Sequence, residues 1–218
     1  MNRPAALAFD LDGTLIDSRE DIRTAVNRMR AGCGLAPLAL DEVVGMVGEG
    51  ARVLVERALA PETSPQRIAR ALASYLATYD EVALDTTRAY DGVPEMLARL
   101  AAAYPLALLS NKGEAMSRRI LAGLGLAGRF RVILGGDSLP TRKPDPAGLR
   151  LAAERLGVAV AGLLLIGDTP IDARTAAAAG SPFLLVEWGF PRRSDLAGVR
   201  ADLRAASPAE VADRLLAL

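Results

Sequence analysis

Two pairs of aspartates carry the clearest chemical signal in this sequence. Asp10 and Asp12 follow the apolar run at residues 5–9, and Asp168 and Asp172 follow another apolar run later in the chain. Carboxylates placed this close together repel one another, which makes them costly unless a cation lies nearby. Mg²⁺ takes oxygen ligands and keeps several of its waters, so a few carboxylates are enough to hold it. The two pairs therefore predict a site for a hard divalent cation.

The lysines add a second signal. The chain contains 24 arginines but only two lysines, Lys112 and Lys143. Because arginine serves everywhere else, a position that keeps lysine is expected to need a compact point charge and not a planar guanidinium. Ser110 and Asn111, just before Lys112, add neutral donors that suit phosphate oxygens. Lys143 near the four carboxylates indicates a phosphate group as well as a cation.

The absence of histidine excludes several kinds of catalyst. Without it the chain cannot build a Ser-His-Asp or Cys-His centre, a histidine-ligated zinc site or a phosphohistidine. A general acid or base must then be an Asp, Glu, Lys, Tyr or Cys side chain.

Composition sets broader limits. The 218 residues suit one domain, or one domain with an insertion, and the balance of 26 basic and 26 acidic residues argues against a general nucleic-acid binder. No apolar run approaches the roughly 18 to 20 residues of a membrane span. Cys33, the one cysteine, cannot form an intramolecular disulfide, and the N-terminus shows no secretory signal. These features predict a cytoplasmic protein that binds neither nucleic acid nor membranes, and they make no prediction of the oligomeric state.

Alternating strands and helices must position the acidic residues. Short apolar runs, typical of strands buried on both faces, alternate with helical patterns and so predict a Rossmann-like α/β fold, a parallel sheet with helices on both faces. In such sheets chemistry gathers at the carboxyl ends of the strands, where Asp10, Ser110 and Asp168 stand. The expected strands are 5–9, 106–109, 132–134, 163–166 and 183–186, and the expected helices are 93–103, 114–124, 145–157, 170–179 and a last one after Ser207.

The segment from residue 16 to 85 breaks this alternation. It shows helical patterns near 18–31, 41–46, 50–59 and 65–82, with no convincing strand. A helical insert between the first and second strands is the simplest interpretation. We therefore expect an α/β core formed by 1–15 and 86–218, with a helical second domain at 16–85.

Two glycine patterns do not indicate nucleotide binding. The run 123–128 has three spaced glycines, but it follows a helical pattern, whereas a dinucleotide fingerprint follows a strand and begins a helix. Gly48 and Gly50 form only a partial match, and they also follow helical sequence.

Residues 9–15, Phe-Asp-Leu-Asp-Gly-Thr-Leu, resemble the first motif of the haloacid dehalogenase superfamily. Three later motifs of that superfamily have counterparts in the right order: Ser110 with Asn111, Lys143, and Asp168 with Asp172. The helical insert resembles the cap domain of the superfamily. Within it, the stretches 47–54 and 135–140 most resemble bacterial phosphoglycolate phosphatases.

The resemblance implies a Mg²⁺-dependent phosphatase that acts on small phosphorylated metabolites, phosphoglycolate first. Asp10 would be the nucleophile that forms an aspartyl phosphate, and it needs no base because a carboxylate with a pKa of about 4 is ionised at neutral pH. Asp12 would protonate the leaving alcohol and then deprotonate the hydrolytic water. The metal would be held by the side chains of Asp10 and Asp168 and by the backbone carbonyl of Asp12. Asp172 would hold a metal-bound water or orient Lys143.

The resemblance also implies that Ser110, Lys143 and backbone amides near Asn111 bind the phosphoryl group. Sugar-phosphate phosphatases, such as one for N-acetylmuramic acid 6-phosphate, and phosphosugar mutases share these motifs and remain alternatives. Asp12 argues against a dehalogenase, since a halide needs no protonation, and the lack of a lysine in the insert argues against a phosphonate hydrolase. A protein of a different class, a non-catalytic binding module, is a further alternative. The intact motifs argue against it.

Specificity would then come from the helical insert. Gly48, Glu49 and Gly50 begin an expected helix, whose free amides could face an anion. Arg52 lies just inside that helix and could pair with a carboxylate in a bidentate fork. Glu49 would repel the same carboxylate unless it points away. We therefore expect Gly48, Gly50 and Arg52 to recognise the acid group of the substrate.

Overall fold

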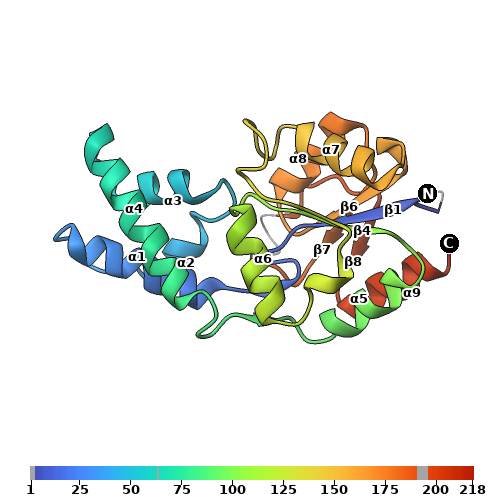
Figure 1. The fold of residues 1–218 in the computed structure, drawn as a ribbon, viewed down its shortest axis with the longest axis horizontal. Coiled ribbons are helices and arrows are strands. Elements are labelled where there is room, and N and C mark those ends of the chain that lie inside the picture. The colour runs from blue at the N-terminus through green and yellow to red at the C-terminus, as the bar shows by residue number, and fades with distance from the viewer. Residues whose placement is uncertain (1–2, 63, 191–195) are drawn as a thin grey trace. The chain divides into compact units, whose positions relative to one another are not determined.

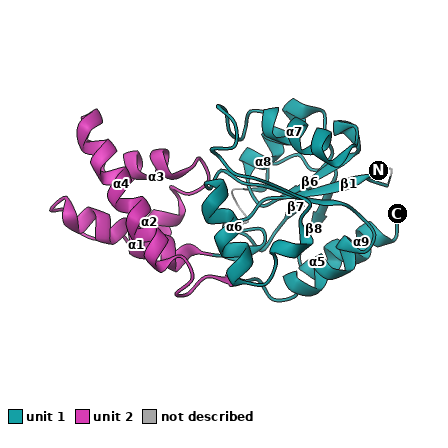
Figure 2. Cartoon of the chain, viewed as in Figure 1, with its two compact units in different colours: residues 1–17, 89–218 teal, residues 18–88 magenta. Residues whose placement is uncertain are grey.

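The chain forms two compact units. The computed structural model describes residues 3–62, 64–190 and 196–218. One unit, here called the α/β unit, is Met1–Asp17 with Ala89–Leu218, and the other, the helical unit, is Ser18–Arg88 (Figure 2). The sequence analysis expected slightly earlier boundaries, with a core of 1–15 and 86–218 and a helical domain of 16–85.

A parallel sheet forms the centre of the α/β unit. Among the described residues its strand order is β5-β4-β1-β6-β7-β8, and each pairing is parallel. Phe9 of the first strand pairs with Leu108 on one side and with Ile166 on the other. The strands are β1 (Ala6–Phe9), β4 (Leu106–Leu109), β5 (Val132–Leu134), β6 (Leu163–Gly167), β7 (Phe183–Val186) and β8 (Leu203–Ala205).

Helices cover both faces of this sheet. They are α5 (Val93–Ala101), α6 (Glu114–Gly123), α7 (Ala147–Leu156), α8 (Pro170–Ala179) and α9 (Pro208–Leu216). Figure 1 shows α7 and α8 on one side of the sheet and α5 and α9 on the other. Every residue of β1, β4, β6 and β7 is buried, which explains why these strands are continuous apolar runs. The predicted fold class is confirmed.

Local signals in the sequence place several helix ends. Ser207 is the N-cap of α9, and its hydroxyl accepts a hydrogen bond from the Glu210 backbone N–H at 3.3 Å. The Glu210 carboxylate in turn accepts from the Ala206 N–H at 2.7 Å, one residue earlier than a capping box would place it. The glycine run at 123–128 begins at the last residue of α6 and ends inside a single 3₁₀ turn, Ala127–Arg129, so it does not follow a strand as a dinucleotide loop does.

The helical unit is built from α1 (Arg19–Gly32), α2 (Leu40–Val44), α3 (Ala51–Ala58) and α4 (Pro65–Val82). Asp21, in the first turn of α1, is buried and accepts hydrogen bonds of 2.5 to 3.1 Å from the backbone N–H and hydroxyl groups of Thr86 and Thr87. Burial alone would raise the pKa of Asp21, but these hydrogen bonds outweigh it and hold the pKa below its ordinary value. They also fasten the segment after α4 to the start of α1.

The sequence interpretation missed three short strands. β2 (Ile16–Asp17) and β3 (Arg88–Ala89) pair as a separate two-stranded sheet where the chain passes between the two units, although 16–85 was expected to contain no strand. Two residues are too few to show a strand period. β8 is a further edge strand of the main sheet, and its partly exposed Leu-Arg-Ala sequence lacks the apolar run of a buried strand.

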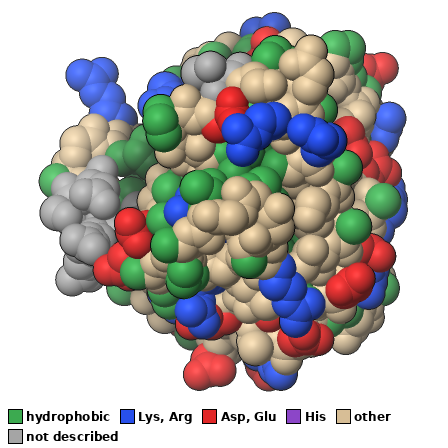
Figure 3. Space-filling model, turned by 90° about the vertical axis from the view of Figure 1, so that its left-hand side faces the viewer, with side chains coloured by type: hydrophobic (Ala, Val, Ile, Leu, Met, Phe, Trp, Pro, Cys, Tyr) green, Lys and Arg blue, Asp and Glu red, His purple; other side chains and the backbone are tan. Residues whose placement is uncertain are grey.

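The described helices and surface agree with the composition. Within residues 3–62, 64–190 and 196–218, no helix is long and apolar enough to cross a membrane. On the face drawn in Figure 3, acidic and basic side chains are interspersed, as expected from the balance of 26 against 26.

Candidate active site

Three strands end together at one edge of the sheet. Asp10 follows β1, Ser110 follows β4 and Asp168 follows β6, and the pairing of these strands brings the three residues to the same edge. The Asp10 N–H donates to the Ile166 carbonyl at 2.9 Å, and the Ser110 N–H donates to the Leu134 carbonyl at 3.0 Å. The ladder of the sheet therefore sets the backbone positions of Asp10 and Ser110.

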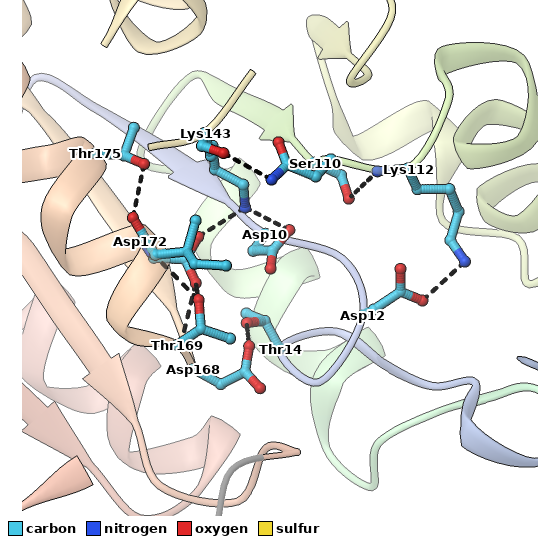
Figure 4. A network of polar contacts seen from close by, with 12 residues as sticks. Asp10, Asp12, Thr14, Ser110, Lys112, Lys143, Asp168, Thr169, Asp172 and Thr175 are labelled. Carbon is cyan, nitrogen blue, oxygen red and sulfur yellow. Dashed lines mark hydrogen bonds and ion pairs between the residues drawn. The ribbon is translucent and has the colours of Figure 1, made fainter. Parts of the chain in front are cut away.

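Lys143 links two of the aspartates. Its Nζ lies 2.8 Å from Asp10 Oδ1 and 2.7 Å from Asp172 Oδ1, and its side chain is almost fully buried (Figure 4). Lys143 stands in the loop after β5, and the Asn111 side-chain amide donates to its backbone carbonyl at 2.9 Å. The sequence analysis assigned Asn111 to phosphate binding, and in the structure its side chain holds the loop that carries Lys143.

Both carboxylate oxygens of Asp168 accept hydrogen bonds. It is fully buried, its Oδ1 accepts from the Thr14 hydroxyl at 3.0 Å, and its Oδ2 accepts from the Phe190 N–H at 2.9 Å. A Cβ atom on Gly13 would lie 2.1 Å from Asp168 Oδ2, and one on Gly189 would lie 2.3 Å from it. Glycine at both positions allows the backbone to close around this carboxylate.

Asp172 is fixed at the N-terminus of α8. Its Oδ2 accepts from the Thr169 N–H at 3.1 Å and from the Thr169 hydroxyl at 2.5 Å. The Thr169 hydroxyl oxygen in turn accepts from the Asp172 N–H at 3.2 Å. Because Lys143 contacts Oδ1, both carboxylate oxygens of Asp172 are already engaged.

The cluster carries an excess of negative charge. Oxygen atoms of Asp10, Asp168 and Asp172 all lie within 4.8 Å of one another. Burial raises the pKa of Asp10 to about 6, although Lys143 lowers it. Burial, and then the charges of Asp10 and Asp172, raise the pKa of Asp168 well above its ordinary value. Burial alone would lower the pKa of Lys143, but Asp10 and Asp172 outweigh it and raise the pKa.

The raised pKa values of Asp10 and Asp168 indicate that the cluster has too little positive charge. Within this group of described residues, three carboxylates are clustered, and the ammonium of Lys143 contacts two of them, those of Asp10 and Asp172. Two of the three have raised pKa values, so protein charge alone does not stabilise them in the ionised form. An oxygen-binding divalent cation fits this donor set and would balance its charge.

Asp12 points away from the cluster. Its Oδ1 lies 3.0 Å from Nζ of Lys112, and Figure 4 shows both side chains apart from the group around Lys143. The side chain of Asp12 is therefore not among the clustered carboxylates.

The expected specificity residues belong to the helical unit. Gly50 is the N-cap of α3 with a φ of 90°, and Gly48 has a φ of 124°, values that favour glycine. Arg52 is 53% exposed and lies 3.5 Å from the glutamate one turn further along α3. Glu49 forms an ion pair with Arg57, which offsets the charge that would repel an acidic substrate.

Sequence reasoning missed the segment that follows β7. The Trp188 indole N–H donates to the Thr14 carbonyl at 3.1 Å, and the N–H of Phe190 binds Asp168. A usable signal existed, because Trp188 and Gly189 stand just past the carboxyl end of a predicted strand, where functional groups gather.

Comparison with known families agrees with this geometry. The sequence model described as haloacid dehalogenase-like hydrolase matches residues 7–186. The chain belongs to the haloacid dehalogenase-like hydrolase family. The matched region runs from the strand before Asp10 to the end of β7 and includes every motif from which the resemblance was inferred.

Relatives of this haloacid dehalogenase-like hydrolase are similar over most of their length. The phosphoglycolate phosphatase of Rhodospirillum rubrum is 41% identical over 197 residues, which cover 87% of this chain and 82% of that protein. The phosphoglycolate phosphatase of Thiobacillus denitrificans is 39% identical over 212 residues, which cover 95% of this chain and 93% of that protein.

Solved structures have the same fold. A predicted phosphoglycolate phosphatase from Haemophilus somnus 129PT superposes with a TM-score of 0.92 at 27% identity and covers 98% of this chain and 99% of its own. A haloacid dehalogenase-like family hydrolase from Streptococcus pneumoniae gives a TM-score of 0.88 at 25% identity, with coverage of 98% and 99%.

Proposed function

We propose that this protein is a Mg²⁺-dependent phosphatase that hydrolyses phosphoglycolate, with Asp10 as its nucleophile. One observation carries the proposal. The buried carboxylate of Asp10 lies 2.8 Å from the ammonium of Lys143, in the same carboxylate cluster as Asp168. The phosphoglycolate phosphatases that are 39 to 41% identical to this chain support the choice of substrate. A single cysteine suits the reducing cytoplasm, the location that we propose.

The reaction proceeds in two steps on Asp10. An oxygen of Asp10 attacks phosphorus and forms an aspartyl phosphate, while the bond from phosphorus to the substrate oxygen breaks. Asp12 in its acid form gives its proton to the departing oxygen, which releases glycolate. Asp12 then accepts a proton from water, and the water oxygen attacks phosphorus of the aspartyl phosphate. Inorganic phosphate leaves, Asp10 is restored, and Asp12 is again in its acid form.

The donors around Asp10 suit Mg²⁺. When bound, the ion would offset the negative charge that the nucleophile and the phosphoryl group share. Asp10 and Asp168 would hold it through their carboxylates, and Asp12 through its backbone carbonyl. Asp172, whose oxygens are engaged by Thr169 and Lys143, would orient Lys143 or hold a metal-bound water.

The phosphoryl oxygens would be bound by Lys143, the Ser110 hydroxyl and backbone amides near Asn111. Because its pKa is raised by Asp10 and Asp172 against the effect of burial, Lys143 stays charged at neutral pH. The hydrogen bond from the Asn111 side chain to the Lys143 carbonyl ties these two parts of the phosphate site together.

A substrate panel tests this function. Phosphate release is measured with Mg²⁺ on phosphoglycolate, N-acetylmuramic acid 6-phosphate, hexose phosphates, nucleotides, pyrophosphate and an aryl phosphate. We expect the highest kcat/KM for phosphoglycolate. We expect no phosphate release from any of the compounds in a chelator. Activity should be poor with Ca²⁺, whose looser coordination shell can occupy both oxygens of the nucleophile. A higher kcat/KM for a sugar phosphate would show that the sugar phosphate, and not phosphoglycolate, is the preferred substrate. Sugar-phosphate isomerisation would indicate a mutase, and no turnover of any compound would indicate a binding module.

The substrate's carboxylate gives a second test, which concerns Arg52. If Arg52 pairs with that carboxylate, Arg52→Ala raises KM for phosphoglycolate at least about tenfold and leaves aryl phosphate turnover nearly unchanged. Arg57→Ala, which removes the ion pair with Glu49 and leaves Arg52 in place, is the matched variant on the same helix. An equal response of both substrates to Arg52→Ala, or none, would remove Arg52 as the specificity residue and leave the hydrolytic mechanism intact.

A further inference from the structure

Lys112 is the charged residue of this site to which the proposed mechanism gives no task. It is one of only two lysines in the chain, and the other, Lys143, contacts the nucleophile. The Lys112 side chain is 9% exposed and that of its partner Asp12 is 13% exposed, with 3.0 Å between Nζ and Oδ1. A pair this shielded is screened by solvent far less than an ion pair on the surface.

The backbone of Lys112 is held at both polar groups. Its N–H donates to the Ser110 hydroxyl at 3.3 Å, and its carbonyl accepts from the Gly136 N–H at 2.9 Å. A Cβ on Gly136 would lie 2.4 Å from the carbonyl oxygen of Asn111, so the chain needs glycine for this approach. The Lys112 side chain therefore extends from backbone that is fixed by hydrogen bonds.

The carboxylate of Asp12 needs such an anchor. Gly13, which follows it, has a φ of 83°, and the chain turns sharply there. In Figure 4 the Asp12 side chain leaves this turn towards Lys112 and away from Asp10. An aspartate side chain has several staggered rotamers, and an ion pair with an anchored lysine selects one of them.

We propose that Lys112 is a positioning residue that holds the carboxylate of Asp12 in place for proton transfer to and from the reacting oxygens. The proposal rests on the function assigned to Asp12 above. Proton transfer by a positioned group contributes about 10² to 10⁴ in rate, and a small misplacement removes much of it. Lysine suits the task because its compact ammonium can donate to an Asp12 oxygen both when that side chain is ionised and when it is in its acid form.

The test compares two leaving groups in four proteins: wild type, Lys112→Met, Asp12→Ala and the double variant. Phosphoglycolate has a poor, alkyl leaving group that needs protonation, whereas 4-nitrophenyl phosphate does not. Hydrolysis of the aspartyl phosphate is common to both substrates, so the first step is isolated by measuring leaving-group release in a single turnover. In that step we expect Lys112→Met to slow glycolate release at least about tenfold and 4-nitrophenol release less than about threefold, with KM for phosphoglycolate within about twofold. In the Asp12→Ala background the same substitution should add no further loss.

Controls separate positioning from general damage. Arg118→Met removes an exposed cation from α6, next along the chain, and should leave both substrates unchanged. Lys112→Arg keeps the charge and should retain more phosphoglycolate activity than Lys112→Met. If the methionine variant does not fold, Lys112→Gln, which keeps an N–H donor, replaces it.

The outcomes distinguish the two proposals. Equal losses on both substrates, additive losses with Asp12→Ala, or a change confined to KM would overturn the role of Lys112 while leaving the phosphatase assignment standing. If Asp12→Ala itself lost both substrates equally, the proposed role of Asp12 would fail, and the role of Lys112 with it.

Discussion

Asp10 is the residue at which chemistry and fold can be separated most cleanly. Asparagine is nearly isosteric with aspartate, but its amide cannot form an aspartyl phosphate. We therefore expect Asp10→Asn to lose at least about a thousandfold in kcat, while thermal stability changes little. Asp213→Asn, an exposed carboxylate on α9 paired with Arg99, is the control and should keep full activity. More than a tenth of wild-type turnover in Asp10→Asn would exclude the covalent mechanism.

The close approach of Gly189 to Asp168 gives a prediction about metal binding. In Gly189→Ala the new methyl group would lie 2.3 Å from Asp168 Oδ2, so the carboxylate must move. We expect Mg²⁺ affinity, measured by calorimetry, to fall at least about tenfold, in the range seen when groups that support metal ligands are changed. Gly198→Ala, a few residues along, has no heavy atom within 4 Å of the added Cβ and should bind as the wild type does. Unchanged affinity in Gly189→Ala would show that Asp168 is not a ligand.

At this scale the sequence shows which carboxylates gather but not how they are held. Asp10 and Asp168 could be placed together because parallel strands end at a common edge. The hydrogen bond from the Phe190 N–H to Asp168 could not be predicted. Every residue except proline has a backbone N–H, and only the tertiary fold decides which of them points at this carboxylate. The direction of Asp12 towards Lys112 depends on a rotamer and a backbone turn that residue types do not encode.

Among the elements, the start of α1 makes the most concentrated set of hydrogen bonds in the helical unit that we describe. Asp21→Asn would place an amide N–H against donors of Thr86 or Thr87, so about 2 kcal/mol of stability should be lost at pH 7. For a chain of this size that corresponds to a fall of about 4 to 8 °C in Tm. Asp85→Asn, exposed and next to Thr86, is the control and should shift Tm very little.

The same contact predicts a pH dependence. The folded-state pKa of Asp21 lies below its ordinary value of 3.8, because the hydrogen bonds outweigh burial. The unfolded chain therefore binds this proton first as the pH falls, and the stabilisation is full above 3.8 and lost as the pH passes through the lower folded value. The difference in Tm between wild type and Asp21→Asn should narrow below pH 3.8 in thermal melts. A constant difference would show that the charge of Asp21 is not involved.

Elements that are buried or long were predictable, and short or exposed ones were not. β1, β4 and β6 are continuous apolar runs because both of their faces are covered. β8 lies at the sheet edge and needs no apolar face, and β2 has only two residues. Such strands exist because a neighbouring strand offers hydrogen bonds, and that neighbour is not visible in local sequence.

For the whole molecule, we expect the negative charge of the cluster to favour metal binding but to lower the stability of the metal-free fold. The raised pKa of Asp168 means that ionising it destabilises the fold in the absence of a cation. Asp168→Asn can keep both contacts, since its Oδ1 can accept from Phe190 and its amide can donate to the Thr14 hydroxyl. In chelator we expect the Tm of Asp168→Asn to exceed that of the wild type by a few degrees. For a chain of this size, each kcal/mol of stability corresponds to about 2 to 4 °C in Tm.

Mg²⁺ should reverse that order. A ligand that binds only the folded state raises stability with its concentration, so Mg²⁺ should increase the Tm of the wild type and not that of Asp168→Asn. Thermal melts with chelator and with millimolar Mg²⁺ measure both effects, and Asp202→Asn serves as a carboxylate control outside the cluster. A lower Tm for Asp168→Asn in chelator, or an equal Mg²⁺ response of the two proteins, would contradict the predicted charge imbalance.

Both lysine ammonium groups of this protein are shielded, with side chains 9% and 3% exposed. The cationic surface is built from arginine, which does not react with acylating reagents under mild conditions. Biotinylation, fluorescent tagging or resin coupling directed at lysine would therefore be slow, and whatever reacted would be modified at the proposed reaction centre. Attachment through Cys33 in the helical unit leaves both ammonium groups untouched.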